Sequence, residues 1–220
     1  MKTPEQQPSS TFQRSPRADR SVDAPPLKVA LPDVVLASDA TLRRVLEARR
    51  STRDYSRGRL DLGQVASLLW AAMGITAPGG LRTAPSAGAI YPLRGYFFSF
   101  RVEGLPPGFY SFDVDTCDLT LMVRGDKQAR LAKACSGQQC VEECAAALLL
   151  TAWYGRVNRE FGEIAPKLVA IEAGHIGQNW HLQAAALGLG SISIGNFDTA
   201  ALKLLLPIDR KSTRLNSSHT

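Results

Sequence analysis

An apolar run followed by a long helical segment constrains the fold of this chain more than any other feature. Residues 145–153 are almost entirely apolar, which is typical of a strand covered on both faces. Residues 165–187 predict one long helix. A buried strand and a long helix in succession, with no repeated strand–helix–strand unit, predict an α+β chain in which helices flank a sheet.

Shorter elements are predicted around these two. Ser38 can cap a helix with Leu42, Val45 and Leu46 on one face. A second helix opens at Asp61, because Gln64 stands three residues later at capping-box spacing, and Gly74 lies where a helix-ending glycine is expected. Further strands are predicted at residues 96–101, 109–113, 119–123 and 191–195, with a turn around Asp115 and helices starting at Asp126 and Asp198.

Composition and charge set the domain boundaries. The chain has 220 residues, and six of its 13 prolines lie among the first 37, so we expect a flexible leader over 1–37. One domain is expected over 38–208. Residues 209–220 are polar and patternless, and we interpret them as a tail that is not native to the domain.

Charge and hydropathy limit the possible partners. The net charge is +6, and half of it lies in the leader and the tail, which does not favour nucleic-acid binding. No apolar run reaches the roughly 18 residues needed to cross a membrane, and the N-terminus lacks an apolar signal region. We therefore expect a cytoplasmic protein that binds neither nucleic acid nor membrane.

The cysteines and histidines do not form a recognisable metal site. Cys117, Cys135, Cys140 and Cys144 lack the spacing of zinc ligands or of a disulfide framework, so ordinary thiols are expected. His175 and His181 are too far apart in register to share a helix face, and hydrogen bonding in a core or interface is expected. No pair of carboxylates suggests acid–base catalysis.

Three segments could contact a ligand, and each has a plainer alternative. Residues 49–53, RRSTR, could surround a phosphate, or could simply be a basic helix end. Residues 85–92, PSAGAIYP, could let a flat ligand approach the backbone, or could be a connecting loop. Residues 188–191 follow a helix and precede a strand, the reverse of a Rossmann turn, but could offer a backbone amide.

Taken together, these segments resemble one family. R-R-S-T-R-D-Y, P-S-A-G-A-I-Y-P, E-A-G-H-I-G-Q-N and A-L-G-L-G-S, in this order, resemble the nitroreductase family of flavoenzymes, and within it the SagB/ThcOx-like dehydrogenase branch. The resemblance covers about residues 38–208. It implies a nitroreductase-like α+β sandwich, with a mixed and mainly antiparallel sheet flanked by helices, that binds FMN at a homodimer interface.

The resemblance also implies which residues bind the cofactor. The flavin phosphate would be held by Arg49, Arg50, Ser51 and Arg53. The flavin ring would lie against Pro85, Ser86, Ala87 and Gly88 of the partner subunit, with a backbone donor supplied at Gly190 and Ser191. No catalytic side chain and no metal ligand is assigned, because the flavin itself carries the hydride.

The implied function is that of an FMN-dependent oxidoreductase with ping-pong half-reactions, in which NAD(P)H is a possible reductant and a small molecule or peptide is the substrate. A peptide thiazoline or oxazoline dehydrogenase of natural-product biosynthesis is one alternative. Azoline-forming members of the branch resemble one another in a Lys-Tyr-Gly segment, but here Glu160-Phe161-Gly162 stands in its place. Members of the family also continue to a final strand, and we expect that this chain is truncated before it. An inactive flavin-fold or partner-binding protein is the second alternative.

Overall fold

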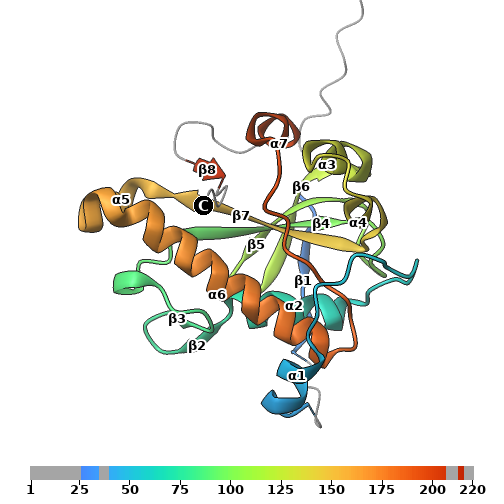
Figure 1. Ribbon diagram of the computed structural model, residues 1–220, viewed down its shortest axis with the longest axis horizontal. Coiled ribbons are helices and arrows are strands. Elements are labelled where there is room, and N and C mark those ends of the chain that lie inside the picture. Colours follow the sequence, from blue (N-terminus) through green and yellow to red (C-terminus); the bar gives the residue numbers. More distant parts are fainter. Residues whose placement is uncertain (1–25, 35–39, 207–212, 216–220) are drawn as a thin grey trace, which may run out of the picture.

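The fold is described from a computed structural model, which covers residues 26–34, 40–206 and, for the backbone alone, 213–215. Its centre is a six-stranded sheet with helices on both faces (Figure 1). The strand order is β1-β6-β5-β4-β7-β8, and every pair of neighbouring strands is antiparallel. The bounds are β1 Lys28–Ala30, β4 Leu93–Ser99, β5 Gly108–Asp113, β6 Asp118–Arg124, β7 Ala146–Trp153 and β8 Thr213–Leu215.

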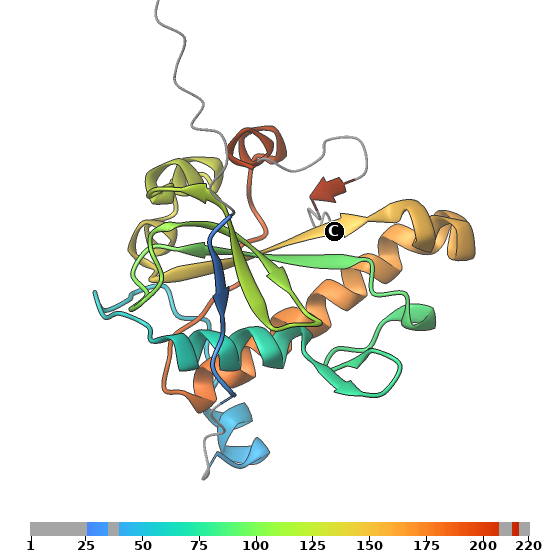
Figure 2. The same cartoon turned by 180° about the vertical axis from the view of Figure 1, so that it is seen from behind.

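Helices cover the two faces of this sheet separately. One face carries α2 (Leu62–Met73) and α6 (Ala165–Ala186), whose apolar side chains pack around Phe97. The opposite face carries α3 (Gln128–Ala134), α4 (Gln139–Glu143) and α7 (Thr199–Leu205), packed around Phe98 (Figure 2). The alternation of side chains along β4 therefore separates two cores, one on each face of the sheet. The predicted α+β sandwich with a mainly antiparallel sheet is confirmed.

Several local signals in the sequence are confirmed. Asp61 caps α2, and both halves of the capping box with Gln64 are formed. Gly74 ends α2 with an extended backbone, and its value is steric, because a Cβ there would lie 2.4 Å from Trp70. Asp113 accepts the amides of the turn that includes Asp115, and Asp198 caps α7.

Other predictions differ from the structure. Thr41 caps α1 (Leu42–Ala48), and the predicted cap Ser38 lies outside the described residues. Of the predicted apolar face only Val45 is buried. The predicted strand at 191–195 is reduced to one parallel bridge, between Ser51 and Ser191, because the chain passes β7 without joining the sheet.

Short elements within predicted loops were missed. They are β2 (Ile75–Ala77), β3 (Leu81–Arg82), η1 (Ala87–Ala89), α5 (Tyr154–Phe161), η2 (Gly162–Ile164) and α4. Two strands fall in predicted unstructured ends: β1 lies within the leader and pairs with β6, and β8 lies within the tail and pairs with β7 at Thr151–Trp153. The rest of these two ends lies mostly outside the described residues. Within the described part of the chain, no helix is both long and apolar enough to span a bilayer.

Candidate functional site

The segment after α1 lies directly beside the segment after α6. Ser51 and Ser191 form a parallel bridge, and the Thr52 amide donates to the Ser191 carbonyl at 3.0 Å. Two of the three predicted ligand-binding segments, residues 49–53 and 190–191, are thus brought together although the sequence separates them widely.

Gly190 allows this approach because it lacks a side chain. A Cβ at this position would lie 2.8 Å from Cγ2 and 3.0 Å from Cβ of Thr52. Contacts this short do not occur between real side chains, so any larger residue at position 190 would push the two segments apart. The glycine is required by packing, which is a different role from the backbone donor predicted for it.

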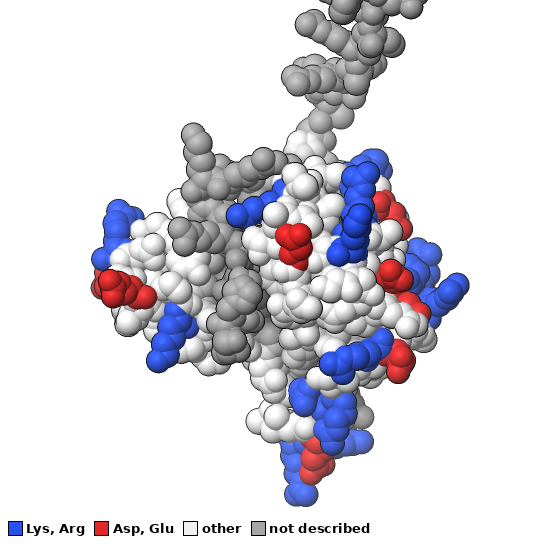
Figure 3. All heavy atoms as spheres, turned by 45° about the horizontal axis from the view of Figure 1, so that its top comes forward, with Lys and Arg blue, Asp and Glu red and all other residues white. Residues whose placement is uncertain are grey.

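Positive charge gathers at this junction. Arg50, Ser51 and Arg53 are exposed and Arg49 is half-buried, so their side chains are accessible to a ligand. Figure 3 shows Lys and Arg side chains gathered at the projection of the molecule that carries α1. A cluster of accessible guanidinium groups is suited to an anionic ligand, because each group can donate two parallel hydrogen bonds to phosphate or carboxylate oxygens.

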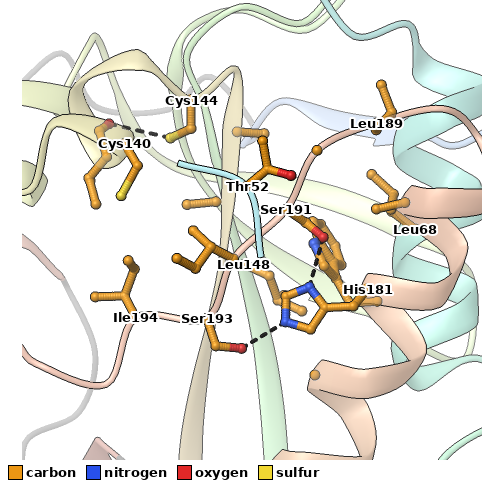
Figure 4. Close-up of a pocket in the computed structure, with 18 of the residues that line it drawn as sticks. Thr52, Leu68, Cys140, Cys144, Leu148, His181, Leu189, Ser191, Ser193 and Ile194 are labelled. Carbon is orange, nitrogen blue, oxygen red and sulfur yellow. Dashed lines mark hydrogen bonds between the residues drawn. The ribbon is translucent and has the colours of Figure 1, made fainter. Parts of the chain in front are cut away.

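His181 ties the segment after α6 back to that helix. Its Nδ1 lies 2.7 Å from Oγ of Ser191 and its Nε2 lies 2.8 Å from Oγ of Ser193 (Figure 4). Burial lowers the pKa of His181, and the positive charge of Arg49 lowers it further. The predicted hydrogen-bonding role of this histidine is confirmed, and its partners fix the same stretch that carries Gly190.

A cavity of about 740 Å³ lies beside this junction, between β7, α6 and the segment after α6. Among the described residues no strand pairs with the outer edge of β7 at residues 146–150, and these residues are only half-buried. The lining is mostly apolar and includes Thr52, Gly190 and Ser191, but none of the three arginines at positions 49, 50 and 53. The cavity and the cationic cluster are therefore neighbours that share only the Thr52–Ser191 junction.

Three thiols line the other end of the cavity. Burial raises the pKa of Cys135 to about 11 and that of Cys144 to about 11, so both stay protonated at neutral pH. All four cysteines are free, as predicted. Among the described residues, no three side chains of His, Cys, Asp or Glu are placed to hold a metal ion.

The third predicted segment, residues 85–88, lies elsewhere on the chain. Ser86 donates a hydrogen bond of 2.5 Å to Glu172 of α6, and Gly88 faces Phe161 at the end of α5. At about 1.5 Å per residue, the stretch of α6 from Glu172 to Ala186 spans roughly 21 Å. Gly190 follows the end of α6 that lies away from Glu172. Within a single chain, residues 85–88 therefore do not lie beside the arginines at positions 49, 50 and 53.

Comparison with known proteins identifies the family. The model of the nitroreductase family matches residues 46–217. This chain belongs to the nitroreductase family. A nitroreductase-like protein of Methanocaldococcus jannaschii, MJ1384, is 32% identical over 195 residues, which cover 84% of this chain and 97% of that protein. The chain is therefore an oxidoreductase of the nitroreductase family.

Solved structures agree with this nitroreductase fold. A nitroreductase-like protein of Ralstonia eutropha superposes with a TM-score of 0.74 and 27% identity, covering 86% of this chain and 85% of that one. One chain of the E. coli microcin synthetase McbBCD complex, with truncated pro-MccB17 bound, has a TM-score of 0.67 at 16% identity, covering 91% of this chain and 74% of that one. The second likeness shows the fold alone.

Glu172 was given no role from the sequence, although it is the first residue of the motif E-A-G-H-I-G-Q-N. Glu172 is 4% exposed and shares the buried face of α6 with Ala165, Val169 and Ile176. This spacing can be recognised in the sequence, and a carboxylate on an otherwise apolar helix face could have marked Glu172 as a candidate functional residue. The hydrogen bonds from His181 to Ser191 and Ser193 could not be predicted from the sequence, because they depend on how the chain turns after α6.

Proposed function

We propose that this nitroreductase-family protein is an FMN-dependent oxidoreductase that transfers hydride between two substrates in turn. The observation that carries the proposal is the junction of residues 49–53 with Gly190–Ser191, which places accessible guanidinium groups beside a glycine-lined backbone. The comparisons support the oxidoreductase class. The cofactor and the reaction are our inference.

The residues at this junction suit a phosphate-bearing cofactor. Arg49, Arg50 and Arg53 offer charge-assisted hydrogen bonds to phosphate oxygens, and the Ser51 hydroxyl offers another donor. The segment at Gly190–Ser191 is kept in place by the Thr52 amide and by His181. Bound FMN would supply the hydride chemistry, which agrees with the absence of an assigned acid–base pair in this chain.

We further propose that the complete site forms between two copies of the chain. Residues 85–88 lie roughly 21 Å along α6 from the segment that carries Gly190, so a flavin held at the arginines needs this loop from a partner. A two-fold pair with α6 helices in opposite directions would create two equivalent sites. Apolar side chains near this helix are available for the contact: Leu42 is 67%, Leu46 50% and Ile171 46% exposed.

In this proposal the residues of the chain bind the cofactor and orient its ring. The arginines hold the phosphate, the partner's loop of small residues lets a flat ring approach, and the second substrate enters from the open face. NAD(P)H is the proposed reductant, and a small molecule or peptide accepts the electrons. We also propose a reducing compartment such as the cytoplasm, because the four cysteines are free.

A peptide azoline dehydrogenase is the second candidate. The fold likeness to one chain of the microcin synthetase McbBCD complex, with truncated pro-MccB17 bound, motivates this candidate. Glu160 and Phe161 argue against it, since Glu160 is an exposed anion and Phe161 lies against Gly88 without a phenolic proton. A protein that binds no flavin and acts through a partner is the outcome that the experiment below would reveal.

The test is the flavin content and flavin affinity of the purified protein. We expect a yellow protein that releases FMN on denaturation. Arg49→Ala and Arg53→Ala should each cost about 1.5–3 kcal/mol of binding free energy, which is tenfold or more in Kd. Arg43→Ala is the matched control, because it removes the same charge from α1, where Arg43 pairs with Glu47. Unchanged FMN affinity in both test variants, or equal losses in the control, would reject the phosphate site.

A further inference from the structure

Glu172 closes the loop that begins at Ser86. The Ser86 hydroxyl donates to Oε2 of Glu172 at 2.5 Å, and the amide of Leu93, at the start of β4, also donates to this carboxylate. Ser86 lies at the beginning of the loop and Leu93 at its end. One buried side chain of α6 therefore binds both ends of residues 86–93.

The loop between these ends has a strained backbone. Gly88, Ala89 and Tyr91 have φ values of 59°, 50° and 50°. The left-handed region is costly for Ala89 and Tyr91, at about 1–2 kcal/mol for each non-glycine residue, so the surrounding contacts must hold the conformation. Oγ of Ser86 accepts the Tyr91 amide at 3.0 Å, and the Tyr91 hydroxyl accepts the Arg82 amide at 3.1 Å. Ser86 thus holds the backbone of Tyr91, Arg82 holds its side chain, and the anchor of Ser86 itself is Glu172.

Burial of the Glu172 carboxyl group is unfavourable for its charged form. Burial raises the pKa of Glu172, although the Ser86 hydroxyl, the Leu93 amide and the charges of Arg82 and His175 oppose the shift. Asp118 is the other buried carboxylate among the described residues; its ion pair with Lys28, at 2.6 Å, lowers its pKa. Glu172 is bonded instead to a neutral hydroxyl and an amide. A buried carboxyl group whose hydrogen-bond partners are a hydroxyl and an amide is unfavourable for stability alone, and it indicates a role in positioning.

We propose that Glu172 is the positioning residue of the flavin-contacting loop, acting through Ser86 on the backbone of residues 87–91. The inference rests on the proposed function, in which this loop lies against the flavin ring held by the partner subunit. Glu172 itself touches no cofactor in this proposal. It selects the strained loop conformation, and FMN affinity depends on that conformation.

The first experiment measures the loop without FMN. Amide hydrogen exchange is followed at Tyr91 and Leu93 in the wild-type chain, Glu172→Gln, Ser86→Ala and the control Asp118→Asn, which removes the charge of the other buried carboxylate. We expect Glu172→Gln and Ser86→Ala to speed exchange at Tyr91 about tenfold or more, while Asp118→Asn leaves it at the wild-type rate. Wild-type exchange at Tyr91 and Leu93 in Glu172→Gln would overturn the proposal.

The second experiment is a double-mutant cycle for FMN binding. Glu172→Gln and Ser86→Ala should each raise the Kd about tenfold or more, and the double variant should be no weaker than the weaker single, because the two residues act as one unit. Additive losses, or equal weakening by Asp118→Asn, would overturn the positioning role. A wild-type chain that binds no FMN would refute the proposed function, whereas the exchange measurement would still decide the role of Glu172 in the loop.

Discussion

Replacing Gly190 by alanine tests whether the junction between residues 49–53 and the segment after α6 is as close as the structure shows. The added Cβ would lie 2.8 Å from Cγ2, 3.0 Å from Cβ and 3.3 Å from Oγ1 of Thr52. Thr52 cannot retreat freely, because its amide is bonded to the Ser191 carbonyl at 3.0 Å. The methyl group must therefore separate the two segments or distort the backbone.

The expected loss follows from two effects. Forcing one extra methyl group into a packed site costs about 1–3 kcal/mol. If the strain is relieved by breaking the bond between Thr52 and Ser191, the loss includes about 0.5–1.5 kcal/mol for that bond. Gly190→Ala should therefore lower the free energy of unfolding by about 1–3 kcal/mol, with a Tm decrease of roughly 2–4 °C per kcal/mol.

Urea unfolding provides the assay, and two further variants sharpen it. Gly174→Ala is the matched control: nothing lies within 4 Å of the added Cβ, and alanine in a helix should stabilise α6 by about 0.8–1 kcal/mol. Thr52→Ser removes Cγ2, the atom nearest to the added methyl group. The double variant Thr52→Ser/Gly190→Ala should therefore recover part of the loss. If Gly190→Ala were as stable as the wild-type chain, the close contact at this junction would be refuted.

Three more outcomes are expected from the described contacts. The pKa of His181 is lowered by burial and by Arg49, so Arg49→Ala should raise this pKa in an NMR titration. Because the folded-state pKa lies below the unfolded value, the free energy of unfolding falls as the pH drops from the unfolded pKa toward the folded one. Arg49→Ala should lose less free energy of unfolding over this pH range. Cys135 and Cys144 should react slowly with a thiol reagent at pH 8 in the folded protein and quickly in urea, since the pKa of each is raised to about 11. Fast labelling of the native chain would contradict these raised pKa values. Asp61→Ala should cost about 0.5–2 kcal/mol in urea unfolding through loss of the α2 cap, and an unchanged midpoint would contradict the capping box.

The sequence was sufficient where structure depends on neighbouring residues. The cap at Asp61, the turn after Asp113 and the cap at Asp198 each join groups within three residues, so local spacing predicts them. The long helix and the apolar strand were also predictable, because their lengths and compositions exclude most alternatives. These elements together determine the sandwich.

Contacts between distant segments were not predictable in the same way. The predicted strand after Gly190 failed because the bridge at Ser191 joins it to Ser51, which lies outside the sheet, and not to a strand of the sheet. The motifs predicted which segments contact a ligand, but not that residues 85–88 and 49–53 lie at different ends of α6. The role of Glu172 was not predicted, because its partner, Ser86, lies far away in sequence.

The two cores on opposite faces of the sheet have a consequence for how the protein can change. Phe97 and Phe98 are consecutive in sequence, yet each belongs to a separate apolar cluster. Substitutions in clusters that share no partners combine additively in their effects on stability. Apart from the side chains that line the cavity, such as Leu131, Cys140 and Leu202, the layer of α3, α4 and α7 can therefore be redesigned, or change in evolution, without disturbing α6, which carries Glu172 and His181.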